Sequence, residues 1–190
     1  DKSEGIGLVK SQDFVDFVNQ DLVVFSNRYS LLAKASEELT EGLEHVFYNH
    51  FNDFTLQNMV ILASVDVTDS PEVFKRKANL VAAYIDIMIS RRMVEYKNFR
   101  YSQMYRPMFQ LAKDLRGKTI DQISAILVDR ISDQDEKIES IVNLRLTKTN
   151  KSDIYYILAR ITSFIESEKS NKYFDKKQKD RFEVEHIWAN

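Results

Sequence analysis

The chain has 190 residues, of which 44% are hydrophobic and 29% are charged, and its formal net charge is −2. This composition excludes an intrinsically disordered chain, and the slight negative charge excludes a protein that is drawn to nucleic acid by its overall field. The lack of cysteine excludes disulfides, thiolate metal sites and cysteine nucleophiles, and it fits a reducing cytoplasm. The apolar runs are shorter than the roughly 20 residues that a membrane-spanning helix needs.

Glycine and proline, which make tight turns and break helices, are scarce, with 4 Gly and 2 Pro in the whole chain. Sandwiches and barrels need many such turns, so the scarcity favours long helices. We therefore expect an all-α fold: a multi-helix, bundle-like domain over residues 11–168, with a short strand-like segment at the C-terminal end.

Apolar residues at three- and four-residue spacing predict a first helix that begins after Ser11 and turns one face to the core. The residues of that face are Phe14, Val18, Leu22, Phe25, Tyr29 and Leu32. The stretch "EGLEHVFYNHFND" predicts another short helical segment. Thr55 is the expected N-cap of the helix that follows, because its hydroxyl can accept a backbone N–H.

A serine followed by proline marks the start of a long helix. Ser70 can cap it, and Pro71 suits the first helical position, where its missing N–H costs nothing. The apolar spacing carries this helix to Arg92. The next helix is expected to open at Ser102 and to stop at Gly117.

Three more helical segments are predicted before residue 168. Thr119 and Gln122 form a possible capping box at the start of the first. The stretch "DEKIESIVNL" is expected to be the second. Ser152 is expected to cap the third, whose core face is predicted to be an unbroken apolar stripe. The stripe comprises Ile154, Ile157, Leu158, Ile161, Phe164 and Ile165.

The pattern changes after Glu168. Residues 169–181 carry six Lys or Arg against two Asp and have no helical period, which indicates a solvated basic linker. Residues 182–190 contain "FEVEHIW", whose period-two alternation is typical of a strand. Basic linkers can attract phosphates, so this one supplies the candidate nucleic-acid-binding residues. They are Lys176, Lys177, Lys179 and Arg181.

The chain has three histidines, and only one has a context that favours catalysis. His45 and His50 are five residues apart, about 140° around a helix axis, so one straight helix cannot bring both to one metal. We interpret both as structural. His186 follows Glu185 at the end of the predicted strand. There the carboxylate can hold a divalent metal while the neutral imidazole takes a proton from water.

Three neighbouring cation–aromatic pairs are of the kind that nucleic-acid stacking surfaces use. They are Arg28–Tyr29, Arg100–Tyr101 and Tyr105–Arg106. The structural interpretation is favoured, because Tyr29 falls on the predicted core face and its neighbour Arg28 can then extend to water.

Three stretches, in this order, resemble the GmrSD-type restriction proteins. They are "FNDFTLQNMVILASVDVTDSPEVFKRKANLVAAYIDIMISRR", "DIYYILARITSFIE" and "FEVEHIW". Proteins of that family combine an N-terminal ParB/sulfiredoxin-like nucleotide-hydrolysing domain, a helical middle region and a C-terminal HNH nuclease domain, and they cut foreign DNA in bacterial defence. The resemblance implies that residues 11–168 are the helical middle region and that residues 182–190 begin the HNH domain.

The resemblance also implies roles for two residues. His186 matches the first His of the HNH motif, the general base, and Glu185 matches a metal-ligating carboxylate, while Ala189 replaces the usual Pro. The implied cofactor of the parent protein is Mg²⁺ or Mn²⁺, and the implied partners are DNA and the two other domains of the same polypeptide. We expect the remaining HNH residues beyond Asn190, and hence a fragment that is inactive and holds no metal by itself.

A second hypothesis, of another class, is a non-catalytic helical protein–protein interaction module. The slight negative charge and the lack of a complete catalytic site favour it.

Overall fold

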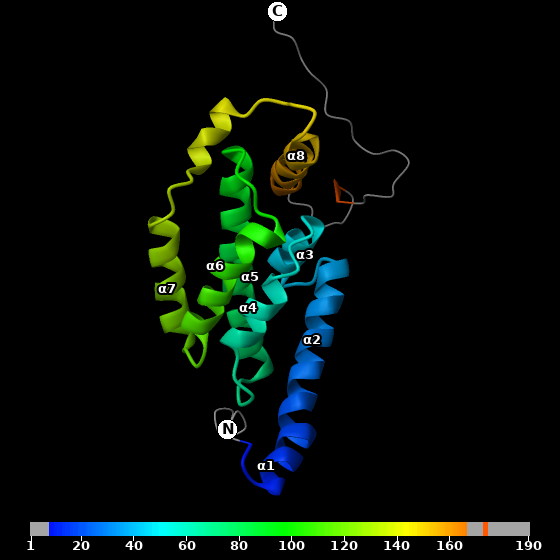
Figure 1. The fold of residues 1–190 in the computed structure, drawn as a ribbon. Helices are drawn as coiled ribbons and strands as arrows, with labels where there is room; N and C mark the ends of the chain where they lie inside the picture. The colour runs from blue at the N-terminus through cyan, green and yellow to red at the C-terminus, as the bar shows by residue number, and fades with distance from the viewer. Residues whose placement is uncertain (1–7, 167–172, 175–190) are drawn as a thin grey trace, which may run out of the picture.

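The computed structural model describes residues 8–166 and 173–174, and this part of the chain consists of helices joined by loops, with no strand (Figure 1). The predicted all-α fold is therefore confirmed, whereas the predicted strand at 182–190 lies outside the described residues. In chain order the helices are α1 (Ser11–Asp16), the π-helical turn η2 (Phe17–Asp21), α2 (Leu22–Glu37), α3 (Glu44–Phe51), α4 (Gln57–Ser64), α5 (Pro71–Val94), α6 (Tyr101–Leu115), α7 (Ile120–Ser132), the 3₁₀ helix η3 (Ile138–Asn143) and α8 (Lys151–Ile165). Within the described residues, no helix has the length and apolar character to cross a membrane.

Helix α5 is the centre of the bundle, because α3, α4, α7 and η3 all pack against it (Figure 1). Its start is as predicted: the Ser70 hydroxyl accepts the Val73 N–H at 3.3 Å, and Pro71 occupies the first turn. The helix ends at Val94, two residues beyond the predicted Arg92. Buried residues occur along its whole length, so α5 is covered on several sides.

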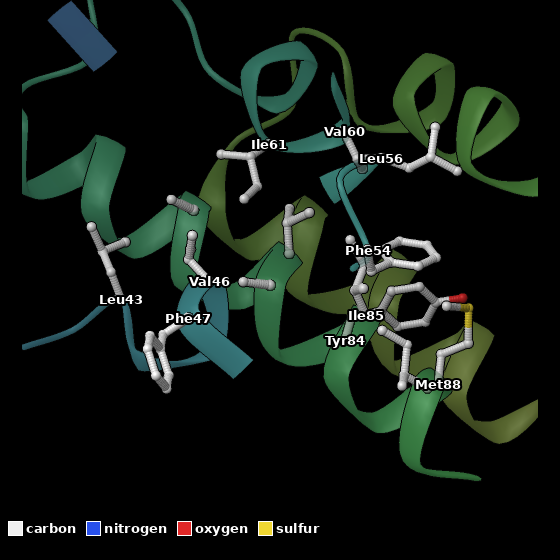
Figure 2. Packing of buried hydrophobic residues seen from close by; sticks show 14 of the residues in the cluster. Leu43, Val46, Phe47, Phe54, Leu56, Val60, Ile61, Tyr84, Ile85 and Met88 are labelled. Atoms are coloured by element: carbon white, nitrogen blue, oxygen red, sulfur yellow. The ribbon is translucent and has the colours of Figure 1, made fainter. Parts of the chain in front are cut away.

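The hydrophobic core includes the junction at which α3, α4 and α5 meet. Figure 2 shows Val46 of α3, Val60 and Ile61 of α4 and Ile85 of α5 close together, and each of these side chains is fully buried. Removal of apolar area from water at this junction is the main favourable contribution to folding, at roughly 25 cal/mol per Å².

Two buried amides cross the same junction. Asn49 Nδ2 donates to Gln57 Oε1 at 3.1 Å and to the carbonyl of Ala82 at 2.9 Å, while Gln57 Nε2 donates to the carbonyl of Val46 at 2.9 Å. Both side chains are almost completely buried. These bonds tie α3 to α4 and α5 and fix the relative positions of the three helices, because a buried amide is costly unless it is hydrogen-bonded.

Helix α7 begins and α6 ends where the sequence predicts. Thr119 Oγ1 accepts the Gln122 N–H at 3.4 Å, and Gln122 Oε1 accepts the Thr119 N–H at 3.0 Å, which confirms the capping box. Gly117 follows α6 with φ of +68°, a left-handed conformation that glycine adopts without steric cost. Its position just past the helix confirms it as the predicted stop.

Three other predicted helix starts are wrong by one or two residues. The N-cap of α4 is Leu56 rather than Thr55, that of α6 is Arg100, and that of α8 is Asn150 rather than Ser152. None of the three N-caps has a side-chain hydrogen bond to its helix. These starts are therefore set by the packing of the loops before them and not by a capping side chain. The segment "DEKIESIVNL" is helical only as the 3₁₀ helix η3.

The N-terminal helix is one continuous rod made of α1, η2 and α2, and its first half extends beyond the ends of the neighbouring helices (Figure 1). Leu32 is fully buried, but Phe14, Val18, Leu22 and Tyr29 are each about half exposed. The prediction that all these residues face the core is thus wrong for most of them. The spacing of the apolar residues correctly identifies one face of this helix. However, no other described helix lies beside the first half of the rod to cover that face.

Candidate functional site

A buried carboxylate, that of Asp86 on α5, forms the centre of the most unusual site. Its side chain is only 5% exposed and has three donors around it. His45 Nδ1 lies 2.8 Å from Oδ2, Tyr156 Oη donates to Oδ1 at 2.7 Å, and Arg160 Nη1 donates to the two oxygens at 2.9 and 2.7 Å. A buried charge is costly unless it is paired and hydrogen-bonded, and these contacts supply both. We call this set of four residues the polar clamp.

Arg160 holds α8 against the rest of the bundle. Its guanidinium lies 3.7 Å from the ring centroid of Tyr48 on α3, within cation–π range, and its Nη1 also donates to Tyr156 Oη at 2.7 Å. The backbone of α8 packs less closely on its neighbours than those of α3 and α5 pack on each other. Long side chains therefore bridge the gap, and the polar clamp joins α3, α5 and α8.

The environment of the polar clamp shifts the pKa values of its members. Burial raises the pKa of the Asp86 carboxyl, but the hydrogen bond from His45 and the charge of Arg160 outweigh burial, so that pKa is lowered overall. Burial, assisted by the negative charge of Asp86, raises the pKa of Tyr156 well above its ordinary value. At neutral pH, Asp86 is thus ionised and Tyr156 is a neutral donor.

We therefore expect the free energy of unfolding to fall at alkaline pH, and we expect the ionisation of Tyr156 to cause part of that fall. The pKa of Tyr156 is higher in the folded than in the unfolded state, so its contribution is complete below the unfolded value of about 10 and is lost as the pH rises toward the folded value. We expect the free energy of unfolding to decrease less in Tyr156→Phe than in the wild type between pH 9 and 11. Each protein is compared with its own value at pH 8. Urea unfolding across this range measures the difference.

Tyr29→Phe is the matched control, because Tyr29 is half exposed and should leave the alkaline loss unchanged. Equal alkaline losses in the wild type and Tyr156→Phe would contradict the shifted pKa of Tyr156.

The Asp86–His45 pair has a chemical capability of its own. A carboxylate that accepts the Nδ1 proton fixes the imidazole tautomer and leaves the basic lone pair on Nε2, as in orienting pairs of hydrolases. The side chain of His45 is 31% exposed, so solvent reaches part of the ring. Among the described residues, however, no group of three or more His, Asp or Glu side chains is arranged to hold a metal ion. The pair is part of the network that joins α3 and α5 to α8.

The polar clamp also explains why the predicted core face of α8 is partly wrong. Ile154 is buried as expected, but Leu158, Ile161, Phe164 and Ile165 are exposed. The buried residues of α8 are Ile154, Tyr155, Tyr156, Ala159 and Ser163. The helix is rotated so that Tyr156 and Arg160 reach Asp86, and the later part of the stripe, from Leu158 on, consequently faces away from the core.

The favoured interpretation of the Arg28–Tyr29 pair is also wrong, since the arginine is inside and the tyrosine outside. Arg28 is 8% exposed, whereas Tyr29 is 52% exposed. The guanidinium donates to the carbonyls of Asp66 and Asp69 at 2.6 and 2.8 Å and lies 5.4 Å from the ring centroid of Phe74. These contacts with the loop between α4 and α5 satisfy the buried charge and hold Arg28 inside.

Two aromatic residues of the predicted linker are buried and pack on the core. Phe174 lies 5.3–5.8 Å, between ring centroids, from Tyr48, Phe51 and Phe47 of α3. Tyr155 Oη donates to the carbonyl of Tyr173 at 2.8 Å. The prediction that 169–181 is solvated is therefore wrong at these two residues. It was based on the number of charged residues in the segment and gave no weight to its two aromatic rings.

A cleft of about 820 Å³ lies beside the polar clamp, between the loop after α3, the loop before α6 and the start of α8. Asp53 and Tyr96 on its wall have φ values of 58° and 56°, which cost on the order of 1–3 kcal/mol in residues other than glycine. Tyr96 Oη also accepts the Arg145 N–H at 2.6 Å, which joins the loop before α6 to the segment before α8. Burial raises the pKa of Asp153, which also lines the cleft.

His186, Glu185 and the four basic residues of the linker are outside the described residues. The residues of the polar clamp were missed as a group. One signal could have pointed to Asp86, namely its position as a lone carboxylate inside the apolar run "LVAAYIDIMI".

Comparison with protein-family models, with curated proteins and with solved structures finds no match to this chain.

Proposed function

We propose that this chain is the helical middle region of a GmrSD-type DNA restriction endonuclease, with DNA and the flanking domains of one cytoplasmic polypeptide as its partners. The observation that supports the proposal most is that two of the three stretches carrying the resemblance contact each other. Asp86 belongs to the first stretch, and Tyr156 and Arg160 belong to the second.

In this proposal the helical region positions the nuclease and performs no chemistry. Helix α8 and the buried Phe174 both precede the segment that contains Glu185 and His186, so the polar clamp and the packing of Phe174 would together anchor the chain ahead of that segment. In the parent protein Glu185 would ligate a divalent metal that stabilises negative charge on the phosphate, and His186 would take the proton from the attacking water.

A version of the protein that is longer at the C-terminus by ~100 residues, a domain-sized addition, tests the proposal. We expect it to nick supercoiled plasmid DNA with Mg²⁺ or Mn²⁺, and we expect His186→Ala to abolish nicking, because the general base is lost. Conversion of supercoiled to open-circular DNA on agarose gels measures it.

The matched control is His50→Ala, since His50 is a partly exposed histidine on α3 and should leave nicking intact. Nicking that persists in His186→Ala would refute the assignment of the base, and nicking lost equally in His50→Ala would point to a folding defect.

A second candidate function, the protein-interaction module, is favoured by one observation. The first half of the N-terminal helix, from α1 to the start of α2, exposes a continuous apolar face. Exposed apolar patches on a surface commonly mark interaction sites. A stable partner that co-elutes on size exclusion, and that Val18→Asp releases, would support this function.

A further inference from the structure

Three aromatic rings lie in a row on the outer face of α6. Tyr101, Tyr105 and Phe109 are spaced by four residues, so they follow one another along one side of the helix. They are 60%, 42% and 45% exposed. Centroids of adjacent rings are 5.5 and 6.1 Å apart, and the second pair is nearly parallel, with 14° between the ring planes. We call these three residues the aromatic row.

The aromatic row has its own positive surroundings, although the chain as a whole is slightly negative. Lys113 continues the four-residue spacing, and its Nζ lies 4.8 Å from the centroid of Phe109. Arg100 precedes the row, Arg106 lies within the same helix, and Arg116 follows it; all are exposed. The one carboxylate of α6, Asp114, is paired with Arg130 of α7. The cations near the row are therefore not neutralised by acids of α6.

The opposite face of α6 shows that the exposure is not caused by loose packing. Met104, Met108, Leu111 and Leu115 are buried, and α6 packs closely on α4. The helix therefore has a filled inner face and a separate outer face with three large rings. Burying an aromatic ring in the core would be favourable, so a row of three left in water is unexplained by the fold itself.

From these observations we infer that the outer face of α6 binds single-stranded nucleic acid. Unpaired bases stack on the aromatic row, and the cations on either side contact the phosphates, the combination by which sequence-independent single-strand binding operates. A single strand is favoured over a duplex, because paired bases are stacked inside the double helix and cannot reach a protein ring.

The outer face of α6 would be the place at which the helical region contacts the DNA of the proposed function, and the inference rests on that function to this extent. Binding of a single strand by the 190-residue chain can nevertheless be measured without any catalysis. Failure of nicking by the longer protein therefore leaves it standing. Conversely, loss of strand binding leaves the assignment of His186 untouched.

Fluorescence anisotropy of a labelled 20-nucleotide oligo-dT with the 190-residue chain tests the inference. We expect saturable binding at 50 mM NaCl that weakens with salt, and weaker binding of a labelled duplex of the same length. Removal of the rings in Tyr105→Ala/Phe109→Ala should raise Kd by about tenfold or more per ring. Tyr105→Phe keeps a ring face and should bind like the wild type.

Arg106→Gln probes the phosphate contact. It should weaken binding to all oligonucleotides alike and reduce the magnitude of the slope of log K against log salt by about 0.7, the value for one phosphate contact on a single strand. Phe164→Ala is the matched control, because Phe164 on α8 is 85% exposed and lies in no aromatic row.

Three results would overturn the inference. They are no binding of oligo-dT at 50 mM NaCl, unchanged binding in Tyr105→Ala/Phe109→Ala, and an equal loss in Phe164→Ala. A separate variant with alanine at the four basic residues of the predicted linker identifies the other source of affinity. If that variant abolishes binding and the ring variant does not, the strand contacts the linker and not α6. The variants are Lys176→Ala, Lys177→Ala, Lys179→Ala and Arg181→Ala, made together.

Discussion

Arg160→Ala should lower the free energy of unfolding by about 3–5 kcal/mol, because Asp86 would keep a buried negative charge without its main cation. The guanidinium also contacts the ring of Tyr48, so its removal takes packing from the same place. Because the guanidinium links α8 to Asp86 of α5 and to Tyr48 of α3, the loss should appear first in α8. Urea unfolding gives the free energy, and hydrogen exchange of α8 amides gives the location.

Arg130→Ala is the control for that experiment. Arg130 forms an ion pair with Asp114, but about a third of each side chain is exposed, and such pairs contribute about 0–1 kcal/mol. Asp86→Leu/Arg160→Leu should recover part of the stability lost in Arg160→Ala, because replacing both charges leaves neither one unpaired. Equal losses in Arg160→Ala and Arg130→Ala would show that the polar clamp contributes no more than a surface pair.

Phe174→Ala should also destabilise the protein by about 3–5 kcal/mol, because a fully packed ring is replaced by a cavity. Phe174 is 4% exposed and packs on three aromatic rings of α3 and on Tyr156. The same loss is expected when the chain is shortened to residues 1–168. The helical domain therefore needs residues beyond the boundary predicted at 168.

Phe164→Ala supplies the comparison, since that ring is largely in water and its removal should change the free energy of unfolding by less than about 0.5 kcal/mol. Thermal unfolding of the variants and the shortened chain, side by side, measures the effect. A shortened chain as stable as the full one would restore the linker boundary at 168.

The sequence predicted those parts of the fold that depend on local chemistry. Scarce glycine and proline, together with helical spacing, gave the all-α fold. The start of α5 was predicted because Ser70 and Pro71 act within one turn, and the start of α7 because Thr119 and Gln122 bond each other's backbone. In each case the interacting atoms are at most three residues apart, so the sequence shows them directly.

The parts that could not be predicted depend on groups far apart in the chain. Arg160 lies 74 residues from the carboxylate that it contacts, and Arg28 lies 38–41 residues from the carbonyls that it satisfies. Apolar periodicity places such cations on the outside by default. The orientation of α8 was wrong for this reason, since one buried carboxylate decides which of its faces turns inward.

For the candidate functional residues, the sequence indicated which residue types are present but not how their side chains are placed relative to one another. It noted Arg100–Tyr101 and Tyr105–Arg106 as separate pairs, whereas the helix brings their rings and Phe109 into one line. The assignment of His186 and Glu185 stays a prediction.

The π-helical turn Phe17–Asp21 has a consequence for the direction of the N-terminal extension. A π turn holds one residue more than an α turn between its hydrogen-bonded groups. The wider turn accommodates this extra residue within the rod, so Ser11–Asp16 keep nearly the same rotation about the helix axis that an uninterrupted α-helix without the residue would give them. Deleting one residue from the turn should therefore leave Phe14 on the same face as Leu22. The N-terminal extension thus tolerates a one-residue change in length without a change in the surface that it presents.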